Sequence, residues 1–336
     1  MASQRVQWID QCKGLGMLFV ILGHTLLIDD CQVLIYGFHM PLFFFLSGLV
    51  CDEKKYSFCS FVRSRFNSIV LPYIFFYLLT WLYWLLVERH FRPLGMEWWQ
   101  PLIGMLYGAQ WGGFMQHNGI LWFLPCLFVT EVLFFLVKRL SMMWKQLLTV
   151  VALALVGFSI KPNLPWCLNI AFVALQFYYL GNLCRSWLYS ENPIDGRLRT
   201  NMVSVFLIMS YCILSIKFMN PVNMATNQYG KIYFFEITAL LGIIACVFLC
   251  RSFSNRKLTR FVWVGVICTN TLAIFAIHQP LLRIIRFGGE HFLSVFPYDS
   301  NLLYALLADV LVILFLMPFI FLWRKYGLPL LKNLYI

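Results

Sequence analysis

The chain has 336 residues, of which 61% are apolar and only 12% are charged. A soluble domain usually carries about 45–50% apolar and about 25% charged residues, so this composition excludes a water-soluble globule. The formal net charge of +12 lies in short Lys and Arg clusters between long apolar runs, a pattern that encodes membrane orientation rather than nucleic-acid binding. The sequence therefore predicts an all-α integral membrane protein.

Apolar runs of transmembrane length follow one another along the chain, separated by charged residues, Pro or polar clusters. At about 20 residues per crossing they predict about ten transmembrane helices in a single bundle, one domain over residues 1–336. The runs cover about 12–28, 32–50, 69–87, 119–137, 146–160, 167–184, 201–219, 231–250, 261–285 and 301–323. The stretch 88–118, rich in Trp, Gly and Pro, is too broken for a span and is expected to form an outer loop or a short interfacial helix.

Basic residues are divided unevenly between alternate loops. One set of loops carries 19 of the 26 Lys and Arg residues, and the other set carries 7. Because loops rich in Lys and Arg stay in the cytoplasm, this bias predicts an even number of spans with both termini cytoplasmic.

The cysteines and the N-terminus indicate neither disulfides, nor a zinc site, nor a removable signal peptide. The eleven cysteines form no C-x-x-C pair, so neither a disulfide framework nor a zinc site is indicated. Residues 1–10 lack the basic stretch, apolar core and cleavage site of a signal peptide, so the first apolar run is expected to remain as a span.

Ionisable and amide side chains occur inside several of the expected spans. Counting about 1.5 Å per residue along each helix places most of them in the outer half of the membrane, with Glu131 nearer the middle. They are His24, His39, Glu131, Glu236, His278, Gln279, Arg283 and Asp309. Such groups are costly in hydrocarbon unless they face a partner or a water-filled cavity, which makes them functional candidates.

Imidazoles beside carboxylates suit three kinds of chemistry: a proton relay, a metal site, or general-base activation of a hydroxyl. The histidines are far apart in sequence and no H-E-x-x-H pair lies on one helix face, which disfavours a metal. The residues alone leave open a proton relay, general-base catalysis, and a structural role in which the charges only bridge helices.

Several segments resemble the membrane acyltransferase-3 family. Those similar to the family as a whole are Arg5–Asp10, Lys13-Gly14, Val20–His24, Phe38–Gly48 and Leu71-Pro72-Tyr73. Those similar to its fucose 4-O-acetylase-like subgroup are Gly119–Pro125, Phe177–Gly181 and Asn270–Pro280.

The resemblance implies a multi-pass O-acyltransferase of the bacterial cytoplasmic membrane. Such an enzyme takes an acyl group, commonly acetyl, from cytoplasmic acyl-CoA and passes it to a sugar hydroxyl of a cell-envelope glycan or lipid-linked saccharide. Acetyl-CoA would be the donor substrate, the saccharide and the lipid bilayer the partners, and neither a metal nor nucleic acid is expected. The rival interpretation is a carrier or flippase for a lipid-linked saccharide, which would use the same charges as a polar path.

The resemblance also implies roles for individual residues. The family's required histidine falls on His24. Our own mechanistic hypothesis is that His24 is the general base and that Glu131 or Asp309 orients its imidazole. Acceptor contacts are expected from His39, Trp122, Glu236, His278, Gln279 and Arg283.

For the donor, the family's paired arginines that contact the CoA phosphates would fall on Arg65 and Ser68, so only the first is basic. Lys54, Lys55 and Arg63 would supply the missing charge. A cytoplasmic cluster of this kind suits the phosphates of CoA, because Arg and Lys bind phosphate oxygens through charge-assisted hydrogen bonds.

Overall fold

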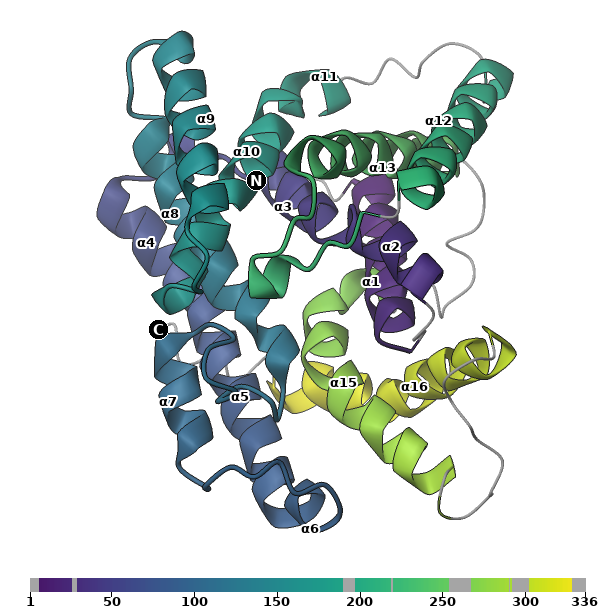
Figure 1. Ribbon diagram of the computed structural model, residues 1–336. Helices are drawn as coiled ribbons and strands as arrows, with labels where there is room; N and C mark the ends of the chain where they lie inside the picture. The colour runs from purple at the N-terminus through teal and green to yellow at the C-terminus, as the bar shows by residue number, and fades with distance from the viewer. Residues whose placement is uncertain are drawn as a thin grey trace.

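The computed structural model describes residues 6–25, 29–189, 197–218, 220–253, 267–289, 291 and 302–327, and every regular element among them is a helix. The one β-type pairing in this part of the chain is an isolated bridge between Asn223 and Gln228. Figure 1 shows the helices as one assembly. The expectation of an all-helical protein is confirmed for the described residues.

The first half of the chain forms α1 (Gln7–Thr25), α2 (Asp29–Tyr36), α3 (His39–Val50), α4 (Phe58–Arg65), α5 (Leu71–Tyr83), α6 (Arg89–Phe91), α7 (Gln100–Tyr107), α8 (Phe123–Val137) and α9 (Met143–Ser159). The second half forms α10 (Leu168–Leu183), α11 (Arg185–Tyr189), α12 (Arg197–Phe218), α13 (Ile232–Phe253), α15 (Thr271–Gly288) and α16 (Leu302–Leu322). Short 3-10 turns are η1 (Glu53–Lys55), η4 (Gly119–Trp122), η5 (Pro165–Cys167) and η6 (Met224–Thr226), and π-helical turns are η2 (Phe66–Val70), η3 (Trp84–Glu88) and η9 (Trp323–Gly327).

Each of the ten predicted apolar runs overlaps a helix in the described part of the chain. Five continuous helical segments there are long and apolar enough to cross a membrane: Gln32–Val50, Phe58–Phe91, Gly119–Val137, Ile232–Ser252 and Leu306–Gly327. The number ten and the cytoplasmic placement of the termini stay predictions, and residues 1–5 and 328–336 lie outside the described residues.

The third helical segment begins earlier than the apolar run predicts. It is continuous over 58–91, so Arg63 and Arg65 lie on helix α4 rather than in a loop. The hydroxyl of Ser57 accepts a hydrogen bond from the Ser60 backbone amide and caps its N-terminus. Pro72 has no backbone N–H to donate within a helix, and the π-helical turn η2 directly precedes it, a local widening that keeps the helix continuous.

Two helices organise the packing. Helix α10 lies against α3, α8 and α9, while α1 contacts α3, α13, α15 and α16. Helix α3 touches both groups and joins them. In Figure 1, α15 and α16 lie side by side at one edge, and α4, α8 and α9 form the opposite edge.

The contact between α3 and α10 depends on two glycines. A Cβ atom at Gly48 would lie 1.9 Å from the Tyr178 carbonyl oxygen, and one at Gly181 would lie 2.0 Å from that of Phe45. Small residues at both positions let the two backbones approach closely, which is the main source of helix attraction in an apolar solvent.

A proline in α15 couples that helix to the loop before η4. Pro280 lacks an N–H, so the carbonyl of Ala276, four residues earlier, loses its partner within the helix. The buried side chain of Asn118 donates to this carbonyl oxygen over 2.9 Å and lies 3.3 Å from the Thr80 hydroxyl. One amide therefore joins three segments that are distant in sequence.

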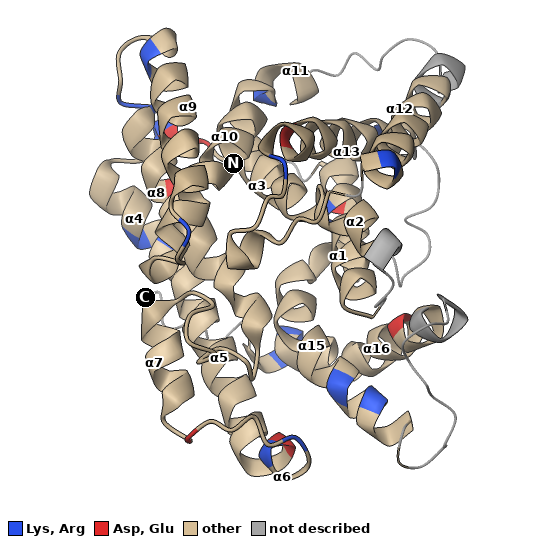
Figure 2. Ribbon diagram, viewed as in Figure 1, with Lys and Arg blue, Asp and Glu red and all other residues tan. Residues whose placement is uncertain are grey.

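The loops meet in two groups, one at each end of the bundle. Near Cys51, Arg185 donates to the Cys51 carbonyl, Arg139 donates to the Tyr56 carbonyl, and Lys138 lies 3.8 Å from Glu53. These are loops that the charge bias assigns to the cytoplasmic face, and most helical ribbon between the two ends carries no charge (Figure 2).

At the other end, the Asn163 amide donates to the carbonyls of Gln110 and Ala225, each over 2.9 Å. These three loops are those that the charge bias assigns to the outer face. Segment 88–118 belongs to this end and packs back on α5, where Tyr77 donates to the Pro101 carbonyl over 2.7 Å.

We expect Gly181→Ala to lower the melting temperature in detergent by several degrees, because its Cβ would meet backbone that cannot yield without separating α3 from α10. Gly288→Ala is the matched control, since a Cβ there meets no atom within 4 Å. Equal melting temperatures for the two variants would contradict this account of the α3–α10 contact.

Candidate active site

Three histidines from different helices gather where α1, α3 and α15 meet. The rings of His24 and His278 lie 5.5 Å apart between centroids. Tyr36, at the end of α2, lies edge-on to two of the histidines, with ring centroids 6.4 Å from His24 and 5.1 Å from His39. We call these four side chains the histidine cluster.

The tautomer of two of these histidines follows from their partners. His39 Nδ1 lies 2.8 Å from the Ile35 carbonyl oxygen, and His278 Nδ1 lies 2.8 Å from that of Phe275. A carbonyl oxygen only accepts, so Nδ1 carries the proton in both rings and Nε2 is left as an acceptor. The Nε2 atom of His278 is buried and has no hydrogen-bond partner among the described residues.

The two carboxylates expected to orient His24 lie in different surroundings. Glu131 forms an ion pair with Arg65, with 2.9 Å between Oε2 and Nε, and only 5% of its side chain is exposed. The Tyr178 hydroxyl faces the same carboxylate, and the Arg65 guanidinium also lies 3.8 Å from the Cys51 sulfur. The structure thus joins a residue expected at the catalytic centre to one expected at the CoA phosphates.

Asp309 and Glu236 also face named partners. The Asp309 carboxylate on α16 faces the side chain of Thr25, the residue that follows His24. Glu236 on α13 accepts a hydrogen bond of 2.7 Å from the Gln176 amide on α10. In the described part of the chain, no hydrogen bond or ion pair joins His24 to Glu131 or Asp309, so the structure brings together the histidines but not the imidazole and its expected orienting carboxylate.

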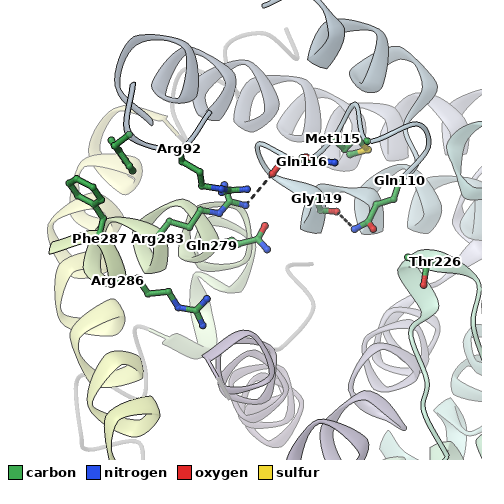
Figure 3. A pocket seen from close by; sticks show the side chains of 12 residues that line it. Arg92, Gln110, Met115, Gln116, Gly119, Thr226, Gln279, Arg283, Arg286 and Phe287 are labelled. Atoms are coloured by element: carbon green, nitrogen blue, oxygen red, sulfur yellow. Dashed lines mark hydrogen bonds between the residues drawn. The ribbon is translucent and has the colours of Figure 1, made fainter. Parts of the chain in front are cut away.

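A cavity of about 760 Å³ opens beside the histidine cluster, between α15 and the loops of the outer group. We call it the outer cavity. Its lining consists of Phe91, Arg92, Gln110, Gly113, Met115, Gln116, Gly119, Thr226, Gln279, Arg283, Arg286 and Phe287. Figure 3 shows the side chains of Gln279, Arg283 and Arg286 extending from one helix toward it. A volume of this order lies in the usual range for small-molecule sites, about 300–1,000 Å³.

Two residues of the lining connect the outer cavity to the histidine cluster. Arg286 lines the cavity and donates to the His24 carbonyl oxygen over 2.9 Å. Gln279, also in the lining, follows His278 directly in sequence, and its side-chain oxygen is buried without a hydrogen-bond partner among the described residues. None of the four side chains of the histidine cluster is itself part of the lining.

One buried carboxylate balances two of the cavity's arginines. Glu88 in η3 has no exposed surface, and it lies 2.6 Å from Arg92 and 3.0 Å from Arg283. Arg283 also donates to the His117 carbonyl oxygen. Burial and the charge of Arg283 lower the pKa of His117, in the loop before η4, to about 3.

At the opposite end of the bundle, the basic residues before the third helix are exposed. Lys54 and Arg63 are exposed, and Lys55 forms an ion pair of 2.9 Å with Asp52. The hydrogen bond from Lys55 lowers the pKa of the Asp52 carboxyl, and Arg185 adds to the effect. Arg65 differs from these residues because it turns inward to Glu131.

The expected acceptor residues are only partly brought together. His39 and His278 lie in the histidine cluster, and Gln279 and Arg283 line the outer cavity. Trp122 is buried in η4. Its ring contacts Phe123, the Phe123 ring contacts Phe275, and the Phe275 ring contacts His278 of the cluster. Glu236 contacts Gln176 instead.

Three residues of this region were missed in the sequence: Tyr36, Arg92 and Arg286. One helix face carries Gln279, Arg283 and Arg286 at the spacing i, i+4, i+7. Arg286 could therefore have been predicted from the sequence as a neighbour of Gln279 and Arg283. The role of Arg92 depends on the loop fold and has no comparable signal.

Among the described residues, no group of three or more His, Cys, Asp or Glu side chains is placed to hold a metal ion. The absence of a metal from the reaction stays a prediction.

A family model described as an acyltransferase domain matches residues 6–326, nearly the whole chain. It is the acyltransferase-3 model, so the family that the segments resemble is confirmed, whereas the fucose 4-O-acetylase-like subgroup is not. No curated protein and no solved structure matches the chain.

Lowering the pH is expected to weaken the fold through His117. In the unfolded chain this imidazole takes up a proton near pH 6.5, whereas in the fold it stays neutral down to about pH 3. The free energy of unfolding should thus fall as pH falls below 6.5, by up to about 1.4 kcal/mol per pH unit from this group. Thermal unfolding between pH 7.5 and 5.5 measures the loss.

The matched pair is His117→Gln, which should show a shallower pH dependence, and His90→Gln, which removes an exposed histidine of α6 as the control. A wild-type slope in His117→Gln would show that His117 does not contribute.

Proposed function

This chain belongs to the acyltransferase-3 family, and on that premise we propose that it is a membrane O-acetyltransferase that moves an acetyl group from cytoplasmic acetyl-CoA to a sugar hydroxyl at the outer face. The acceptor would be a cell-envelope glycan or a lipid-linked saccharide, and the membrane a bacterial cytoplasmic membrane. The coarser statement, a membrane acyltransferase, follows from the family together with the long apolar helices.

The observation that carries the proposal is the position of His24. The residue that matches the family's required histidine lies in a cluster of imidazoles, and its backbone carbonyl accepts a hydrogen bond from Arg286, which lines a cavity large enough for a saccharide. An imidazole has the right proton affinity for general-base catalysis near neutral pH, and a cavity beside it can hold the hydroxyl that loses the proton.

The reaction follows from these groups. The acceptor hydroxyl oxygen attacks the carbonyl carbon of the acetyl thioester while His24 removes the hydroxyl proton. A C–O bond forms, the C–S bond breaks, and the proton passes to the departing CoA thiolate. No covalent intermediate on the protein is needed.

Of the two carboxylates considered as the orienting group, Asp309 has the better position. It faces Thr25, the neighbour of His24 on α1, whereas Glu131 is held by Arg65. We assign Glu131 to the support of Arg65 at the start of the third helix.

The donor would bind at the opposite end, where Lys54, Lys55 and Arg63 are exposed. Cationic side chains there suit the phosphates of CoA, and the pantetheine arm is long enough to carry the thioester into the bundle. The nucleotide would stay on the cytoplasmic side while the acetyl group reaches His24.

We expect His24→Ala to abolish acetyl transfer while acetyl-CoA binding is kept, because only the base is removed. Purified protein in nanodiscs, radiolabelled acetyl-CoA and a crude envelope glycan acceptor measure CoA release and binding together. His90→Ala, a histidine on the exposed surface of α6, is the matched control and should retain wild-type rates.

Wild-type transfer by His24→Ala would overturn the assignment of the base. A wild-type protein that neither binds nor turns over acetyl-CoA would overturn the acetyltransferase proposal and favour the carrier.

Measuring acetyl-CoA binding tests the roles of Lys54 and Arg63 separately from catalysis. Lys54→Gln and Arg63→Gln should each raise the dissociation constant for acetyl-CoA roughly threefold to tenfold, because each removes one charge near the phosphates. Lys145→Gln, an exposed lysine near Trp144 on the same predicted face, should leave it unchanged. Equal constants for all three variants would place the CoA phosphates elsewhere.

Arg65 needs a different substitution. Arg65→Ala would leave Glu131 buried without its partner, at a cost of about 3–5 kcal/mol in stability, so weaker binding would not be informative. Arg65→Lys keeps the charge opposite Glu131 and is the variant to compare.

A further inference from the structure

The lining of the outer cavity is strongly cationic. Three guanidinium groups, those of Arg92, Arg283 and Arg286, border a single space. The fully buried carboxylate of Glu88 pairs with two of them, Arg92 and Arg283. Among the described residues no Asp or Glu side chain lines the cavity, so its described lining carries excess positive charge.

The two arginines of α15 present this charge from one helix face. Arg283 and Arg286 lie one turn apart, and Figure 3 shows both side chains reaching toward the cavity. Each is partly fixed by the protein, Arg283 by Glu88 and the Gln116 carbonyl, and Arg286 by the His24 carbonyl. Each guanidinium has five N–H donors in a fork that matches carboxylate and phosphate oxygens.

The remaining polar groups suit a sugar. Gln279 offers a buried side-chain oxygen that has no partner among the described residues, and Gln110, Gln116 and Thr226 border the same space. Amide and hydroxyl groups of this kind pair with sugar hydroxyls, because each can donate or accept. The cavity thus combines groups for neutral hydroxyls with groups for a negative charge.

We propose that the outer cavity binds an acidic saccharide, whose carboxylate or phosphate is held by Arg283 and Arg286 with Arg92 at the edge. The inference rests on the proposed function, in which this cavity receives the acceptor. Since Arg286 contacts the backbone of His24, an anion held there would set a neighbouring sugar hydroxyl next to the imidazole. The acceptor class is therefore acidic rather than neutral.

The test measures binding without any acyl donor, so it is independent of acetyl transfer. The protein is placed in nanodiscs of phosphatidylcholine, and methyl glucuronide, glucose 6-phosphate and neutral methyl glucoside are titrated at constant ionic strength by saturation-transfer NMR. We expect the two acidic sugars to bind about tenfold more tightly than methyl glucoside, the effect of one charge-assisted contact. Equal affinities of the three sugars would overturn the proposal, whether or not the protein transfers acetyl groups.

Substitutions test which arginines cause the preference for acidic sugars. Arg286→Gln and Arg283→Gln should each remove most of the preference for acidic sugars while the affinity for methyl glucoside is kept. Arg283→Lys is included because Arg283→Gln leaves Glu88 with a single partner, and it should retain part of the preference. Arg89→Gln is the matched control, an arginine of α6 that stacks on Trp84 outside the cavity lining and should bind like wild type.

A final experiment tests whether the anion bound in the cavity belongs to a saccharide or to a lipid headgroup. Nanodiscs that contain phosphatidylglycerol should leave the affinity for methyl glucuronide within about twofold of the phosphatidylcholine value once ionic strength is matched. Loss of all sugar binding in phosphatidylglycerol would assign the cavity to an acidic lipid and overturn the saccharide proposal.

Discussion

The structure depends on one constraint: a polar group placed among apolar helices must find its partner inside the protein, because the surrounding hydrocarbon offers none. Glu131 on α8 meets Arg65 at the end of α4, and Glu88 meets Arg283 on α15. The carbonyl freed by Pro280 is satisfied by Asn118 from a distant loop. Each pairing joins segments far apart in sequence, so the costly groups also determine which helices become neighbours.

The same constraint separates the molecule into two chemically different ends. Exposed Lys and Arg side chains gather on the loops near Cys51, whereas the opposite loops, held together by Asn163, enclose the outer cavity. The proposed transfer from a cytoplasmic donor to an acceptor at the outer face would use both ends. Arg286, which lines the outer cavity, connects it to the histidine cluster through the His24 carbonyl.

Arginine has two distinct uses in this protein. Arg65 is turned inward and balances a buried carboxylate, which is a contribution to packing at the start of the third helix. Arg283 and Arg286 are anchored by Glu88 and by the His24 carbonyl, yet both still border an open space. Because these contacts hold the guanidinium groups in place beside the cavity, an anion bound there would need little reorganisation of the two side chains.

The sequence by itself determined the helical class, the positions of the apolar helices and the family, because hydrophobic run length and short motifs are local properties. It also singled out the polar residues within the runs, since any ionisable side chain among apolar neighbours is conspicuous. Only the tertiary structure decided their partners: Glu131 with Arg65 instead of His24, Glu236 with Gln176, and Arg92 and Arg286 in the outer cavity. The physical reason is that two side chains become partners only when their helices pack in a particular rotation about their axes. The sequence of either helix alone does not specify that rotation.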